Sequence, residues 1–201
     1  MVDIGVIVKD GDVDLEKVMA ALRELAETDV LVGIPEDKSA REKTGPGKED
    51  ITNAQLAYIH TNGVRRLSMR KEMQPDIDAG KPYPMVLKAY VQEHGSPLWH
   101  SPPRPFLEPS IEKHIDEIKE DLETATAAAL EGEDVRSHLE KIGMDAASNA
   151  KNYFEEDNGW PPNAPETIKR KNGGTQPLVG ITGLLRGAIS YVIRKKGERG
   201  A

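Results

Sequence analysis

Histidines are the residues best suited to metal binding or proton transfer in this chain, which has no cysteine. The five histidines are His60, His94, His100, His114 and His138. His94 and His100 fall in one segment, and His114 shares a predicted helix face with Glu117. A metal site needs three or four converging ligands in a defined geometry, and no spacing typical of such ligands is present. We therefore expect no metal and no cofactor.

The sequence also lacks the motifs of nucleophilic catalysis and nucleotide binding. It contains no Gly-x-Ser-x-Gly turn, no phosphate-binding loop and no dinucleotide fingerprint. Gly173-Gly174 has neither the spacing nor the following helix of a phosphate-binding loop. The acidic run 155–157 closes a predicted helix, which is more typical of a solvated helix end than of a cation site. We therefore predict no catalytic residue and a protein that is not an enzyme.

Charge is distributed unevenly along the chain, whose net charge is −7. Residues 110–157 contain 14 acidic and 5 basic residues, whereas residues 158–201 contain 2 acidic and 8 basic ones. The overall sign argues against a dedicated duplex-binding protein. The basic clusters 169–171 and 194–196 lack the interleaved aromatic residues that single-strand binders use for stacking. Two hypotheses stay open: the basic end contacts the acidic middle of another copy, or it neutralises its own acidic helices.

At 201 residues the chain is long enough for one domain with its own core, and we predict a single domain over residues 1–201. Hydrophobic residues make up 37%, with only two Phe and two Trp, so we expect a thin, aliphatic core. Two hypotheses stay open: the chain is a subunit that completes its burial against neighbouring copies, or it has a small core under long polar loops. No apolar run approaches the length of a membrane span, and the N-terminus lacks the basic region of a secretory signal.

The first third of the chain predicts a strand, a helix and a second strand. Residues 2–8 are rich in β-branched residues and predict a strand. Asp12 or Asp14 can cap a following helix, and residues 30–34 predict the next strand. The apolar residues at helical spacing are Leu15, Val18, Met19, Leu22, Leu25 and Ala26.

Two loops and a short helix are predicted next. The polar residues 36–50 indicate a loop, and Thr52 or Asn53 can cap a short helix that ends at Asn62-Gly63. Residues 65–84 show little periodicity and contain several Pro and Gly residues. We interpret about 64–100 as an inserted loop, within which residues 86–91 indicate a helix or a strand.

Two helices with narrow apolar stripes are predicted in the acidic middle, and their narrowness indicates that they pack on a sheet or on each other. The first begins at Ser110, and its stripe comprises Ile111, Ile115, Ile118, Leu122, Ala125 and Ala129. The stripe of the second comprises Val135, Leu139, Ile142, Ala146, Ala150 and Tyr153. Residues 188–194 predict a closing strand, followed by a flexible tail over about 195–201.

Two proline-rich segments are predicted to be stiff, because proline fixes the backbone angle φ and has no N–H group to donate a hydrogen bond. The prolines around Arg104 hold Phe106 and Leu107 in a stiff extended segment that enters the first long helix. Phe106 is either a core anchor or a residue that sets this helix against a subunit interface. Trp160 precedes Pro161-Pro162 and is either a buried plug or an interfacial hot spot.

At these residues the chain resembles the virion-morphogenesis proteins of bacteriophages that complete the tail or join head and tail. Glu93-His94-Gly95 followed by Arg104-Pro105-Phe106-Leu107-Glu108-Pro109 matches one family motif. The second match comprises Trp160, Pro162, Asn163, Pro165, Thr167, Ile168, Arg170 and Lys171, and the third comprises Pro177, Leu178, Thr182, Gly183, Leu185 and Arg186. The resemblance spans roughly residues 50–194. The chain departs from the family at residues 179–181, where an acidic residue is common before Thr-Gly, and in a longer polar stretch after Gly63.

The resemblance implies an α+β fold: a small curved, mainly antiparallel sheet packed by two long helices, with extended loops. It implies a structural subunit of the virion, assembled in the host cytoplasm, that forms a ring of most often six copies at the head–tail junction. Its partners would be its own copies, the tail tube and the connector, with no membrane and no specific nucleic acid, although DNA passes through the lumen. Alternatives are a minor tail or baseplate-proximal protein and a nucleic-acid-binding accessory factor. The residues expected to form interfaces or structural motifs are Arg104, Pro105, Phe106, Leu107, Trp160, Pro162, Asn163, Arg170, Thr182, Gly183, Leu185 and Arg186.

Overall fold

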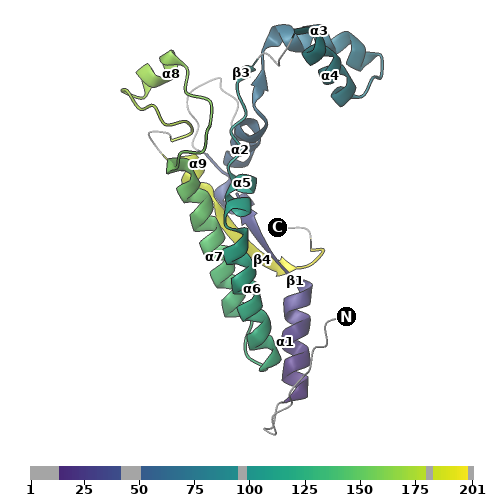
Figure 1. Cartoon of the computed structure of the whole chain (residues 1–201), viewed down its shortest axis with the longest axis vertical. Helices are drawn as coiled ribbons and strands as arrows, with labels where there is room; N and C mark the ends of the chain where they lie inside the picture. Colours follow the sequence, from purple (N-terminus) through teal and green to yellow (C-terminus); the bar gives the residue numbers. More distant parts are fainter. Residues whose placement is uncertain (1–13, 42–50, 95–98, 180–182, 199–201) are drawn as a thin grey trace.

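The computed structural model describes residues 14–41, 51–94, 99–179 and 183–198, which are mainly helical (Figure 1). Their strands form two separate antiparallel pairs, β1 with β4 and β2 with β3. The predicted α+β class is confirmed, with sheets that are small. The strand predicted over residues 2–8 lies outside the described residues.

The lower half of Figure 1 is a stem built from one strand pair and three long helices. Asp14 caps α1 (Leu15–Glu27) by accepting hydrogen bonds from the N–H groups of Glu16 and Lys17. β1 (Thr28–Gly33) follows without a loop and pairs with β4 (Ser190–Lys195) along its whole length. The helix and the strand predicted at these positions are confirmed.

The acidic middle of the chain forms α5 (Leu107–Lys113), α6 (Ile115–Leu130) and α7 (Arg136–Asn152), which the 3-10 turn η2 (Tyr153–Glu155) continues. α7 packs on both strands of the stem, and α6 packs between α7 and α1. The approach of α7 to β4 is close: a Cβ atom on Gly143 would lie 2.4 Å from the Tyr191 ring. A glycine is therefore needed where this helix crosses the sheet.

The two predicted stripes differ in outcome. All members of the α7 stripe are buried except Tyr153, which is half-buried. Of the stripe predicted on α6, only Ala125 and Ala129 are buried, whereas Ile115 and Leu122 remain 41% and 40% exposed. The single helix expected from Ser110 starts at Leu107 and is interrupted at His114. The closing strand starts at Ser190 because residues up to Ala188 belong to α9 (Leu184–Ala188).

The segment interpreted as an inserted loop is mostly helical, so that interpretation is wrong. β2 (Val64–Arg65) and β3 (Trp99–Ser101) form a short ribbon that carries the hairpin of α3 (Leu67–Asp78) and α4 (Tyr83–His94). This arm projects from the upper end of the molecule in Figure 1. A small core of its own holds the two helices together, and it comprises Met69, Met73, Val86 and Tyr90.

Three further helical segments, all short, complete the described part of the chain. Thr52 forms a capping box with Gln55 at the start of α2 (Asn53–Asn62), and Gly63 ends this helix at φ 71°, as predicted. η1 (Glu36–Lys38) occupies the start of the predicted loop 36–50, of which residues 42–50 lie outside the described residues. α8 (Pro165–Arg170) follows the second proline-rich segment. None of the described helices combines the length and apolar character of a membrane span.

Candidate functional site

The two proline-rich segments are bonded to each other by a reciprocal pair of contacts, which we call the clamp. The Arg104 guanidinium donates from Nε and Nη2 to the carbonyl oxygen of Pro161, at 3.1 and 2.9 Å, and from Nη2 to that of Pro162 at 3.1 Å. In return, Trp160 Nε1 donates to the carbonyl oxygen of Pro105 at 3.0 Å. Because Arg104 is only 6% exposed, these bonds form out of bulk water and hold the segments in one arrangement.

An aromatic cluster lies beneath the clamp and joins it to the end of α7. The Phe106 and Phe154 rings lie 4.7 Å apart, and Trp160 meets Phe154 edge-on at 5.9 Å. Both Phe side chains are fully buried, together with Ile189 at the start of β4. This junction therefore contains both Phe residues of the chain and one of its two Trp residues.

The segment after α8 is tied back to the second proline-rich segment through backbone carbonyls. Asn163 Nδ2 donates to the carbonyl oxygens of Thr175 and Gln176 at 3.1 and 3.0 Å. Lys171 Nζ donates to the Gln176 carbonyl oxygen at 2.8 Å. Leu178, at a φ of 59° that is uncommon for a side chain of its size, is then turned toward the core. These contacts build one wall of a cavity.

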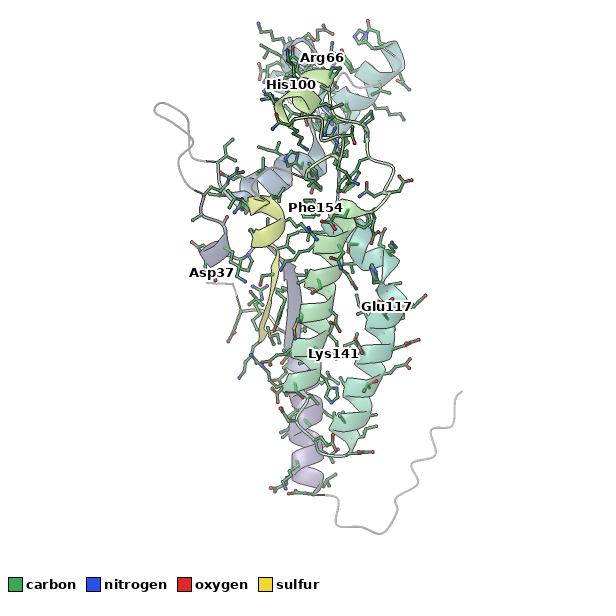
Figure 2. The ribbon with its side chains drawn as sticks, turned by 90° about the vertical axis from the view of Figure 1, so that its left-hand side faces the viewer. Asp37, Arg66, His100, Glu117, Lys141 and Phe154 are labelled. Atoms are coloured by element: carbon green, nitrogen blue, oxygen red, sulfur yellow. The ribbon has the colours of Figure 1, made fainter. Side chains whose placement is uncertain are left out.

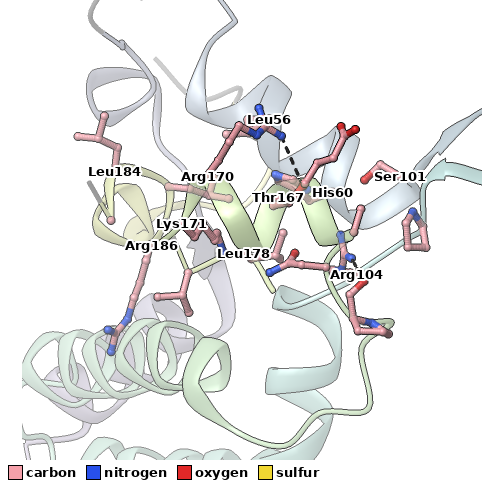
Figure 3. A pocket seen from close by; sticks show the side chains of 18 of the residues that line it. Leu56, His60, Ser101, Arg104, Thr167, Arg170, Lys171, Leu178, Leu184 and Arg186 are labelled. Carbon is pink, nitrogen blue, oxygen red and sulfur yellow. Dashed lines mark hydrogen bonds between the residues drawn. The ribbon is translucent and has the colours of Figure 1, made fainter. Parts of the chain in front are cut away.

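The cavity has a volume of about 850 Å³ and lies between α2, the segment 100–104, α8 and α9 (Figure 3). Its cationic side chains come from segments that are far apart in the chain, namely Arg41, Arg104, Arg170, Lys171 and Arg186. Leu56, Leu178, Leu184 and Leu185 provide apolar surface, and Glu166 is the acidic residue of the lining. The cavity therefore combines several positive charges with apolar walls.

Electrostatics around the cavity follow from this crowding of cations. Burial, followed by the charge of Arg104, lowers the pKa of Lys171, and burial also lowers the pKa of Arg104. Burial and the charges of Arg104, Arg41 and Lys171 lower the pKa of His60 to about 4, so this imidazole is neutral at neutral pH. Its Nδ1 is buried and has no hydrogen-bond partner among the described residues. Burial disfavours a charge of either sign, whereas the contributions of neighbouring cations to the His60 and Lys171 shifts show that positive charges are crowded here.

One of the cations is already neutralised within the chain. Arg186 forms an ion pair with Glu155 through Nη1 and donates from Nε to the Lys151 carbonyl oxygen at 2.8 Å. Figure 3 shows its side chain directed toward α7. The hypothesis that the basic end neutralises its own acidic helices thus holds at this position. For Arg41, Arg104, Arg170 and Lys171, the described part of the chain provides no ion-pair partner.

The residues predicted to form interfaces or structural motifs gather around this cavity. Those that line it are Arg104, Pro162, Asn163, Arg170, Gly183, Leu185 and Arg186. Phe106, Leu107 and Trp160 lie in the core behind it, and Pro105 contributes the carbonyl of the clamp. Thr182 lies outside the described residues. Within those residues, no group of three His, Cys, Asp or Glu side chains could hold a metal ion.

Sequence reasoning named His60 but did not predict that α2 contributes one side of this cavity. Leu56 and His60 lie one turn apart on this helix, and the His60 carbonyl oxygen accepts a hydrogen bond from the Arg104 N–H at 2.7 Å. Arg41 precedes α2 by more than ten residues. No local pattern marks these residues, because only the tertiary fold brings α2 against the first proline-rich segment.

Comparisons of the chain with protein-family models, curated proteins and solved structures found no match. The resemblance to phage tail-completion proteins therefore stays a hypothesis from the sequence, to be weighed with the geometry of the site.

Proposed function

We propose that this chain is a structural virion protein of a tailed phage that completes the tail or neck as a ring of identical copies. The observation that carries the proposal is the clamp. The motifs on which the resemblance rests lie more than fifty residues apart, yet Arg104 and Trp160 bond them into one unit. Proline-stiffened segments fixed in this way present a rigid surface to a neighbour at little cost in conformational entropy.

Incomplete burial of the stem supports an assembling subunit. Leu15 is 71% exposed on α1, and Leu130 is 57% exposed on α6. Leu31 and Val192 face each other across β1 and β4, and each is 40% exposed. Among the described strands, none pairs with the outer edges of β1 or β4. A two-stranded sheet with open edges is marginal by itself, and neighbouring copies would cover such surfaces.

A nucleic-acid-binding accessory factor is the second candidate, favoured by the positive charge of the cavity. It is the weaker candidate because the chain carries a net charge of −7 and no Phe, Tyr or Trp side chain among the described residues lines the cavity for base stacking. The two candidates differ in outcome: the ring subunit binds its own copies, whereas the accessory factor binds DNA with a strong dependence on salt.

The proposal is tested by imaging particles made when the gene for this chain is disrupted. The joining role predicts DNA-filled heads and separate tails, and supplying the wild-type chain from a plasmid should restore complete virions. Complete, infectious virions in the absence of the chain would refute it. A purified chain that forms closed rings under the electron microscope would support the same role independently.

A further inference from the structure

Several cationic side chains of the cavity have no ion-pair partner among the described residues. Arg170 is exposed on α8, and its one polar contact among the described residues is a 3.4 Å bond to the Thr167 hydroxyl. Lys171 donates a hydrogen bond to a backbone carbonyl oxygen, and the buried Arg104 donates to two others. Neutral carbonyls satisfy the donors of these groups but leave their charges uncompensated. A ligand with negative charge would supply what the cavity lacks.

The lining favours protein carboxylates over the phosphates of a nucleic acid. Leucine side chains from α2, from the segment after α8 and from α9 lie beside the cations (Figure 3). A volume of about 850 Å³ is larger than one carboxylate requires, so several side chains can enter together. The ligand that fits is a protein segment with acidic and apolar side chains side by side.

Such a segment is exposed on the same chain. Glu117, Glu120 and Glu123 lie on the outward side of α6, exposed and without an ion-pair partner in the described structure. Ile115 and Leu122, seven residues apart, form a partly exposed apolar edge on the same helix, and of the three glutamates Glu123 lies nearest to it. Figure 2 shows Glu117 on α6, beside α7 in the stem.

We propose that the cavity binds the acidic face of α6 from a second copy of this chain, a contact that rests on the proposed ring function. α6 does not line the cavity of its own copy, so the contact has to be made between copies. It joins two different surfaces, one from each copy, and such head-to-tail contacts close into rings when the rotation allows.

The test exchanges the charges of the two surfaces. Self-association of the full chain is then measured from the dependence of its average mass in solution on protein concentration. Arg170→Glu and the pair Glu117→Lys with Glu120→Lys should each raise the dissociation constant of self-association by about tenfold or more, since like charges then face each other. Mixing the two variants should restore association to within about threefold of wild type, because the exchanged charges again attract. Lys88→Glu, an equal charge change on the exposed side of α4, is the matched control and should leave association unchanged.

Two further measurements keep the inference open to refutation if a variant is poorly folded. Thermal melting of each variant should match the wild type, because the changed side chains are exposed. Self-association of the unmodified chain should weaken by about tenfold or more when salt is raised well above physiological strength. Association that is insensitive to both salt and Arg170→Glu would overturn the inference and leave the ring itself intact.

Other outcomes point elsewhere. A wild-type chain that stays monomeric at high concentration would also overturn this contact, whereas the imaging of virions judges the proposed function separately. Binding of a single-stranded oligonucleotide that Arg170→Glu abolishes and the α6 pair does not affect would assign the cavity to nucleic acid instead.

Discussion

Replacing Arg104 by methionine tests whether the clamp holds the two proline-rich segments together. Methionine keeps an unbranched side chain in the buried position but removes the charge and all donors. The carbonyl oxygens of Pro161 and Pro162 then lose the guanidinium that bonds to both of them. The change leaves the aromatic cluster in place, so the loss of stability measures the contribution of the Arg104 hydrogen bonds to the clamp.

The magnitude follows from the bonds that are lost. A hydrogen bond that involves a charged group contributes about 1.5–3 kcal/mol to stability. The three bonds of Arg104 share Nη2, and removing a buried guanidinium also removes the cost of its desolvation, so they do not add in full. We expect Arg104→Met to lower the free energy of unfolding by about 2–3 kcal/mol, which corresponds to a fall in melting temperature of about 5–10 °C for a chain of this size. Arg104→Lys keeps the charge but lacks the forked guanidinium, so its free energy of unfolding should lie between those of the wild type and Arg104→Met.

Circular dichroism melting and urea titration measure this loss, with Arg170→Met as the matched control. Arg170 loses the same guanidinium from an exposed position outside the clamp, so its melting temperature should stay within about 1–2 °C of wild type. If Arg104→Met also melts within about 1 °C of wild type, the clamp contributes little and the rigid surface inferred from it is not justified.

Further substitutions test the packing around the site and in the stem. Trp160→Phe should cost about 1–2 kcal/mol in urea titrations through the lost indole hydrogen bond, and an impaired assembly with unchanged monomer stability would show that this side chain is interfacial instead. Gly143→Ala should cost about 1–3 kcal/mol, because its Cβ atom would lie 2.4 Å from the Tyr191 ring, whereas Gly187→Ala, with open space around it in α9, should be neutral or stabilise by up to about 1 kcal/mol. The pKa of His60 is lowered from 6.5 to about 4 on folding, so protonation favours the unfolded chain. The stabilisation from neutral His60 is complete above pH 6.5 and declines as the pH falls toward 4, by at most about 1.4 kcal/mol per pH unit, a slope that His60→Gln should remove from the pH dependence of unfolding.

Some elements could be predicted because their signals are local. The α7 stripe lies on one face of a single helix, and burial of Leu139 and Ile142 follows from that periodicity. The caps at Asp14 and Thr52 act within three residues, so the starts of α1 and α2 could be read from the chain. The arm was missed because Pro75 and its neighbours indicate a break, although apolar residues four apart, Met69 and Met73, are the helical signal that packing confirms.

Local patterns were therefore sufficient for the helices and strands of the stem, whereas the α+β class was predicted from the family resemblance. The cavity depended on the tertiary structure, because its cations come from Arg41, Arg104, Arg170 and Lys171, on separate stretches of chain. The clamp depended on it as well, since Arg104 bonds to backbone carbonyl oxygens, which every residue has and no residue type reveals. Side-chain spacing reports what a helix buries; it does not report which distant backbone a buried guanidinium will meet.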